Sequence, residues 1–271
     1  MSGVEKFERY LRASEEVAIS GSGELRAGEA LVRISGSGRY VEGELLKLAG
    51  SARVKGDLEV KTVAASGSLR VEGSLKASDF RSSGSVIVER DLEAGSLSAS
   101  GSLRVGGELR ARSARISGSL GAESVRAEYL EADGALEIRD LLKVSKAVLR
   151  PCGNSSIGRI EADSLEVRRA KPIRGELSLR LGPIEVDIAL RGGVAFRSGR
   201  KGVLKVKSID TLRAILEGVE CEELRAEVAV LKRGCRIGRA VYSERLEVEE
   251  GVEIGEVVKV EDPFNRGREP S

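Results

Sequence analysis

The segment 67-GSLRVEGSLKA-77 returns almost unchanged as 101-GSLRVGGELRA-111. Around these two segments glycine recurs at one constant interval, at Gly50, Gly67, Gly84, Gly101 and Gly118, and then one position early at Gly134. Apolar residues keep the same interval, for example in the column Val54, Val71, Val88 and Val105. A fixed period of this length indicates a repeat protein in which each unit packs only on its neighbours.

The spacing inside one repeat predicts strands. Its inward positions are Leu69, Val71, Leu75, Ala77, Phe80 and Ser82. Most of these steps are two residues long, as in a strand, whereas a helix needs steps of three and four throughout. Glycine and serine at Gly73–Ser74 and Gly84–Ser85 suit sharp corners between the segments. Segments this short must pair with their copies in the next coil. We therefore predict an all-β fold, a single-stranded parallel β-helix (β-solenoid) with about 17 residues per coil.

Departures from the repeat divide the chain into parts. Regular coils are expected at residues 16–170, and again at 203–260, where 234-GCRIG-238 recurs as 251-GVEIG-255. Residues 171–202 contain two alternating apolar runs around Gly182 and Pro183, which predicts an irregular insertion or a β-hairpin.

The two ends of the chain differ from the repeat. Residues 1–15 predict a short capping segment with a helix, because Val4, Phe7, Tyr10 and Leu11 fall on one helical face. Residues 261–271 contain two prolines and few apolar residues, so a disordered tail is expected.

Composition narrows the class of protein. The 271 residues are 41% hydrophobic but only 3% aromatic, which favours a narrow core of aliphatic side chains. The net charge of +2 provides no basic excess for nucleic acid or for an anionic membrane. Glutamine is absent while Glu and Arg abound, as is typical of a thermophile. No apolar run approaches the ~18 residues of a membrane span, so we expect a cytoplasmic protein, with the membrane periphery left open.

The sequence predicts neither catalysis nor a cofactor. Histidine is absent, and Cys152, Cys221 and Cys235 lack metal-ligand spacing, so packed thiols are expected. The glycine-rich segments lack the Lys-Ser or Lys-Thr of a phosphate loop. The carboxylates that a β-helix hydrolase or lyase would need are scattered over different columns, at Asp57, Asp79, Asp91, Asp133 and Asp140. We predict that the chain is not an enzyme and binds no metal.

Tandem coils of the form G-S-L-x-V-x-G-x-L-x-A resemble the bactofilins, a family of polymer-forming cytoskeletal proteins. The resemblance covers residues 50–144 and, less closely, 234–260. It implies a right-handed parallel β-helix that assembles end to end, without nucleotide, into filaments that act as scaffolds. The implied partners are further copies of the chain, together with other cytoplasmic proteins or the membrane periphery.

Two alternatives to a polymerising scaffold stay open: a non-polymerising β-helix binding scaffold, and a carbohydrate-active β-helix enzyme. A solenoid exposes unpaired strands at both ends, where another copy can dock. The assembly candidates are therefore the apolar residues nearest the ends: Phe7, Tyr10, Leu11, Val257, Val258, Val260 and Phe264.

Overall fold

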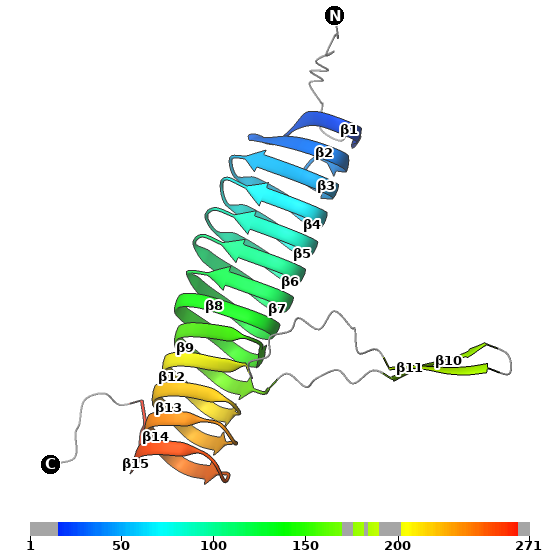
Figure 1. Cartoon of the computed structure of the whole chain (residues 1–271). Helices are drawn as coiled ribbons and strands as arrows, with labels where there is room; N and C mark the ends of the chain where they lie inside the picture. The colour runs from blue at the N-terminus through cyan, green and yellow to red at the C-terminus, as the bar shows by residue number, and fades with distance from the viewer. Residues whose placement is uncertain (1–15, 170–175, 182–183, 190–201, 265–271) are drawn as a thin grey trace, which may run out of the picture. The chain divides into compact units, whose positions relative to one another are not determined.

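A computed structural model describes residues 16–169, 176–181, 184–189 and 202–264 of the chain. Every regular element in these ranges is a β-strand, and thirteen of the fifteen strands form one sheet (Figure 1). The strands are β1 (Glu16–Ala27), β2 (Ala30–Val41), β3 (Leu45–Lys55), β4 (Leu58–Val71), β5 (Leu75–Val88), β6 (Leu92–Val105), β7 (Glu108–Ala122), β8 (Ser124–Pro151), β9 (Asn154–Val167), β10 (Glu176–Leu181), β11 (Ile184–Ala189), β12 (Val203–Leu216), β13 (Val219–Leu231), β14 (Arg236–Val248) and β15 (Glu253–Lys259). The predicted β-solenoid is confirmed.

The interior columns inferred from the repeat are real ladders. Strands β4 to β7 pair in parallel, and each residue faces its counterpart in the next repeat. One ladder joins Leu69, Val86, Leu103 and Leu120, whose exposed fractions are 2%, 0%, 1% and 1%. Burial of such a column is the main source of stability, at roughly 25 cal/mol per Å² of apolar surface.

The glycine column forms one corner of the coils, where the backbone takes positive φ. Gly67, Gly84, Gly101 and Gly118 have φ values of 115°, 128°, 115° and 130°. A Cβ atom on Gly84 would lie 2.2 Å from the carbonyl oxygen of Gly67. Both the dihedral angle and the close stacking of consecutive coils therefore require glycine at this corner.

At a second corner of the coils, the contacts alternate from one coil to the next. The copy most similar in sequence to a given segment therefore lies two repeats away rather than one. Asp57 Oδ1 accepts a hydrogen bond of 2.7 Å from the backbone N–H of Ser74. A Cβ atom on Gly73 would lie 2.3 Å from that same oxygen. Two coils later Asp91 repeats the contact with the N–H of Glu108, at 2.8 Å. Coils with an acceptor therefore alternate with coils that supply the donor.

The N-terminal coils differ from the prediction, which placed parallel coils from residue 16 onward. Strand β1 pairs antiparallel with β2, and β2 antiparallel with β3. The corner glycines still stack, because Gly21 faces Gly36 and Gly36 faces Gly50. The steps between these glycines are shorter than one repeat, so the chain cannot complete a coil. Instead it reverses at two tight turns, in which Gly28 and Gly43 have φ values of 60° and 66°.

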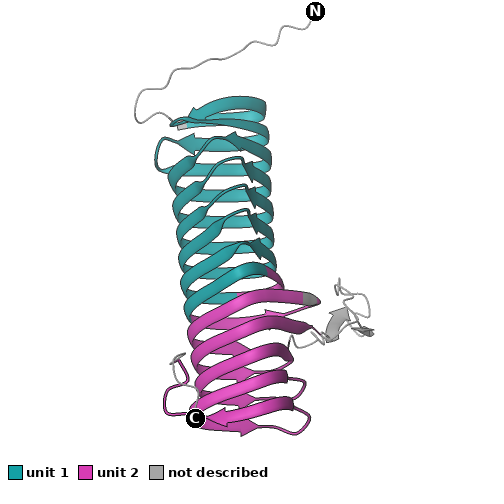
Figure 2. Ribbon diagram, turned by 90° about the vertical axis from the view of Figure 1, so that its left-hand side faces the viewer, with its two compact units in different colours: residues 1–131, 138–145 teal, residues 132–137, 146–271 magenta. Residues whose placement is uncertain are grey.

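The chain divides into two compact units. Unit 1 comprises residues 1–131 and 138–145, and unit 2 comprises residues 132–137 and 146–271. In each unit the strands follow one another as stacked coils (Figure 2; unit 1 teal, unit 2 magenta). Strand β8 contributes residues to both units.

Unit 2 contains the insertion expected at residues 171–202. Strand β9 pairs in parallel with β12, and Leu204 faces Ser155. Along the sequence, Ser155 and Leu204 are separated by one regular repeat plus the length of the stretch 171–202. Within this stretch β10 and β11 form an antiparallel hairpin, a form of insertion that the alternating sequence led us to expect. Beyond it, β12 to β15 pair in parallel.

Candidate functional site

The open end of unit 2 is formed by β15. Strand β15 pairs with β14 along one edge, with Val257 facing Ala240 and Val258 facing Val241. Among the described residues, no strand pairs with its other edge. An edge of this kind presents unpaired N–H and C=O groups to any further strand.

Interior ladders reach the surface at this end. The column Ile209, Leu224 and Ala240 is buried, with exposed fractions of 0%, 1% and 1%, but its last member, Val257, is 51% exposed. A second column passes from Leu216 (0%) and Leu231 (0%) to Val248, which is 48% exposed. Both valines occupy core positions for which the described chain supplies no next coil.

The C-terminal candidates chosen from the sequence lie on this end of unit 2. Val257 is exposed, Val258 and Val260 are half-buried, and Phe264 is 37% exposed. The backbone N–H of Val260 still donates to the carbonyl oxygen of Tyr242 at 2.9 Å. The backbone N–H of Phe264 donates to Asp262 Oδ1, also at 2.9 Å. The three N-terminal candidates, Phe7, Tyr10 and Leu11, lie outside the described residues.

Val248 was missed from the sequence, although it belongs to the same surface. Its alternation with Leu246 matches that of a buried strand, so the residues beside it give no sign that it is exposed. The available signal lies one repeat further on: position 265 is Asn, so no apolar residue continues the column. A ladder that ends in this way exposes its last member.

Among the described residues, the large exposed apolar side chains all belong to unit 2. They are Leu212, Ile215, Val248, Val257 and Phe264. In unit 1 the first strand, β1, instead buries Leu25 and Ala27, which are 7% and 5% exposed. Val257, Val248 and Phe264 together define the surface that we call the C-terminal end surface.

A ladder of alternating charges runs up the outer wall beside this surface. Lys205 Nζ lies 3.6 Å from Glu220 Oε2, Arg236 contacts Glu220 at 3.1 Å, and Arg236 contacts Glu253 at 2.9 Å. The hydrogen bond and the charge of Arg236 hold the pKa of the Glu253 carboxyl below its usual range. Glu253 is the last rung, and within the described part of the chain it pairs with a cation on one side only.

The same outer wall of unit 2 contains an open depression of about 610 Å³. Its lining includes Gly238 and Gly255, which stack closely on each other, and the neighbouring pair Ile237–Ile254. The four side chains of the charge ladder line it together with Glu222, so two cations and three anions face the depression. Within the described residues no group of three His, Cys, Asp or Glu side chains could hold a metal ion.

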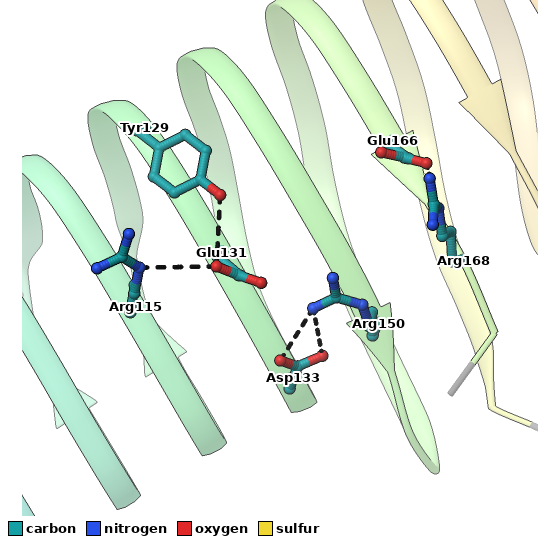
Figure 3. Close-up of polar contacts among 7 residues, drawn as sticks. All are labelled: Arg115, Tyr129, Glu131, Asp133, Arg150, Glu166 and Arg168. Atoms are coloured by element: carbon teal, nitrogen blue, oxygen red, sulfur yellow. Dashed lines mark hydrogen bonds and ion pairs between the residues drawn. The ribbon is translucent and has the colours of Figure 1, made fainter. Parts of the chain in front are cut away.

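The carboxylates expected in different columns make contacts that stabilise the coils, and for two of them the expectation was wrong, because Asp57 and Asp91 occupy the same column two repeats apart. Asp133 accepts two hydrogen bonds of 3.0 Å from Arg150 (Figure 3). Glu131 contacts Arg115 at 3.7 Å and receives the Tyr129 hydroxyl at 3.4 Å (Figure 3). Exposed pairs of this kind contribute about 0 to 1 kcal/mol each, so they adjust the stacking more than they determine it.

Two of the three thiols, those of Cys221 and Cys235, are packed as expected, whereas Cys152 is partly exposed. All three cysteines are free, and Cys221 and Cys235 are buried. Burial raises the pKa of Cys221 to about 12 and also raises the pKa of Cys235. Both thiols therefore stay protonated at neutral pH, and a protonated thiol is neither a nucleophile nor a metal ligand.

No family model matches the chain, and comparisons with curated proteins and with solved structures also found no match. The resemblance to the bactofilins therefore stays a prediction. Across the described residues, no helix is long and apolar enough to cross a membrane.

Proposed function

We propose that the chain is a structural protein that assembles with copies of itself, end to end and without nucleotide, into a bactofilin-like scaffold. The single observation that supports this most is the C-terminal end surface, where core valines such as Val257 and Val248 are about half exposed. Interior ladders whose last member is exposed to solvent favour continuation of the stack by another chain.

Docking at this end provides both apolar burial and hydrogen bonds. Covering the exposed half of a valine side chain stabilises an assembly by about 1 kcal/mol. The edge of β15 with which no described strand pairs adds main-chain hydrogen bonds to whichever strand lies against it. Glu253 offers a further contact, since a cation placed above it continues the alternation of Lys205, Glu220 and Arg236.

The proposal requires no cofactor. The glycine-rich repeats lie at coil corners, where Gly67 and Gly84 have backbone roles. Stacking of strands and ladders needs neither a bound phosphate nor a metal. Assembly should therefore proceed in EDTA and in the absence of ATP and GTP.

Electron microscopy of the pure protein tests the proposal directly. We expect elongated particles longer than one chain, in buffer with EDTA and no nucleotide. Particles no larger than a dimer at every protein concentration and salt concentration tested would contradict the proposal and favour the non-polymerising binding scaffold. A strict requirement for nucleotide would contradict it as well.

A further inference from the structure

One outward column of unit 2 changes from charged to apolar in the last two coils. The register sets Asp210 opposite Arg225, Arg225 opposite Val241, and Val241 opposite Val258. Successive residues of a strand point to opposite faces. Because Ala240 belongs to a buried interior column, its neighbour Val241 points outward. The outer wall of β14 and β15 therefore carries two stacked valines where the preceding coils carry charges.

These outward valines are covered, although they lie on the outer wall. Val241 is only 9% exposed, and Val258 is half-buried. By contrast Val257, which points inward from the same strand as Val258, is 51% exposed. In this part of unit 2 the outward side chains are thus better covered than the inward one. Their cover must come from a segment that lies against the outer wall.

The chain that follows β15 is placed to supply this cover. The backbone N–H of Val260 donates to the carbonyl oxygen of Tyr242 at 2.9 Å, so the chain stays on β14 up to this residue. The N–H of Phe264 then donates to Asp262 Oδ1 at 2.9 Å, a bond that closes a tight turn. After β15 the chain turns back towards β14 (Figures 1 and 2). We call residues 261–264 the C-terminal turn.

Pro263 is the buried member of the C-terminal turn. A proline has no N–H, so it cannot extend the sheet as part of a further strand, and its ring is left to pack on an existing surface. Three residues span up to about 10 Å from Val260 to Pro263. This reach includes Val258, two residues before Val260, and Val241, one strand spacing further on. The burial of Pro263 and the burial of the two valines therefore explain each other.

We propose that the C-terminal turn is a strap, which packs Pro263 on the outward Val241 and Val258 and fastens β15 to the outer wall of unit 2. Among the described strands β15 pairs with β14 alone, and a strand held along one edge opens more easily than a strand held along two. The strap supplies the missing attachment.

The strap also has a regulatory role, and this part of the inference rests on the proposed function. Strand β15 carries Val257 and the edge on which a second copy would dock. Release of the strap lets β15 open, which removes that surface. The C-terminal turn thus controls whether the C-terminal end surface is formed.

Amide hydrogen exchange at a protein concentration low enough to give small species tests the strap without assembly. Pro263→Ser and Val241→Ser should each make the amides of β15 exchange at least fivefold faster than in the parent. Because both changes remove the same contact, the double variant should exchange no faster than the faster single variant. The matched control is Glu261→Ser, an exposed residue of the same turn, which should leave exchange unchanged. Unaltered protection of β12 and β13 shows that unit 2 is still folded.

The strap is overturned if β15 exchanges equally fast in Pro263→Ser and in the parent, or if the two single effects multiply in the double variant. Sedimentation velocity at higher concentration then tests the regulatory role, for which Pro263→Ser should give smaller species than the parent. Faster exchange with assembly equal to that of the parent would overturn this role. Faster exchange in Pro263→Ser, together with a parent that stays small at every concentration, would support the strap and contradict the proposed function.

Discussion

Replacing Leu103 by Asp tests whether the interior ladder determines the fold. Leu103 is 1% exposed, and it lies between Val86 and Leu120 in the register of β5, β6 and β7. Loss of a buried leucine side chain costs about 3 to 5 kcal/mol. The carboxyl that replaces it has no charged partner in an apolar column, which adds about 2 kcal/mol or more. Domains of this size are stable by about 5 to 15 kcal/mol, so the variant should lose much of its stability.

The measurement is the urea midpoint followed by circular dichroism, compared with Arg104→Asp. Arg104 is the next residue along β6 and points outward, so its substitution should change the free energy of unfolding by less than about 0.5 kcal/mol. Where Leu103→Asp does not fold, Leu103→Ala provides the comparison, with a loss of about 3 kcal/mol. Burial raises the pKa of a carboxyl, so the destabilisation in Leu103→Asp should also decrease as the pH falls. Equal effects at positions 103 and 104 would refute the inward and outward assignment.

Further predictions concern the corners and the thiols. Gly84→Ala should lower the free energy of unfolding by about 1 to 3 kcal/mol more than Gly43→Ala does, as measured by thermal or urea unfolding. The reason is that a Cβ on Gly84 collides with the backbone of Gly67, whereas nothing lies within 4 Å of a Cβ on Gly43. Equal losses in the two variants would contradict the stacked corner. Cys221 has a raised folded-state pKa of about 12, so its contribution to stability is complete below the unfolded-state pKa of about 8.5 and is lost as the pH rises towards 12. Urea unfolding between pH 8 and pH 11 should therefore show a shallower decline for Cys221→Val than for the parent, and identical slopes would count against a buried, protonated thiol. A thiol reagent at pH 8 should label the partly exposed Cys152 and leave Cys221 unlabelled until the protein unfolds.

The solenoid could be predicted because its periodicity is strict where the coils are regular. From Gly50 to Gly118 the corner glycines recur at one unchanging interval, and the structure pairs each of them with the next. The hairpin at residues 176–189 was similarly foreseeable, because two alternating runs flank a Gly-Pro pair. The alternation of apolar residues and the fixed spacing of the corner glycines are local properties of the sequence. The tertiary contacts between stacked coils reinforce both.

The antiparallel pairing of β1, β2 and β3 could not be predicted from the repeated columns of residues alone. Gly21, Gly36 and Gly50 stack as corner glycines whichever way the intervening chain runs, so their recurrence does not report strand direction. The shortened steps between these glycines were the only signal. The position of Val248 on the C-terminal end surface was missed for a different reason. Exposure at the end of a ladder depends on the residue that occupies the same column one repeat later, and not on the last member itself.

The central claim is that the C-terminal end surface mediates self-assembly, and sedimentation velocity of paired variants tests it most directly. Val257→Lys with Val248→Lys places two charges on this surface, and Ile87→Lys places one on the outer wall of unit 1. With EDTA and without nucleotide, the parent and Ile87→Lys should sediment as large species. The double variant should sediment as small species with an unchanged β-sheet spectrum. Assembly of the double variant to the same size as the parent would contradict the account.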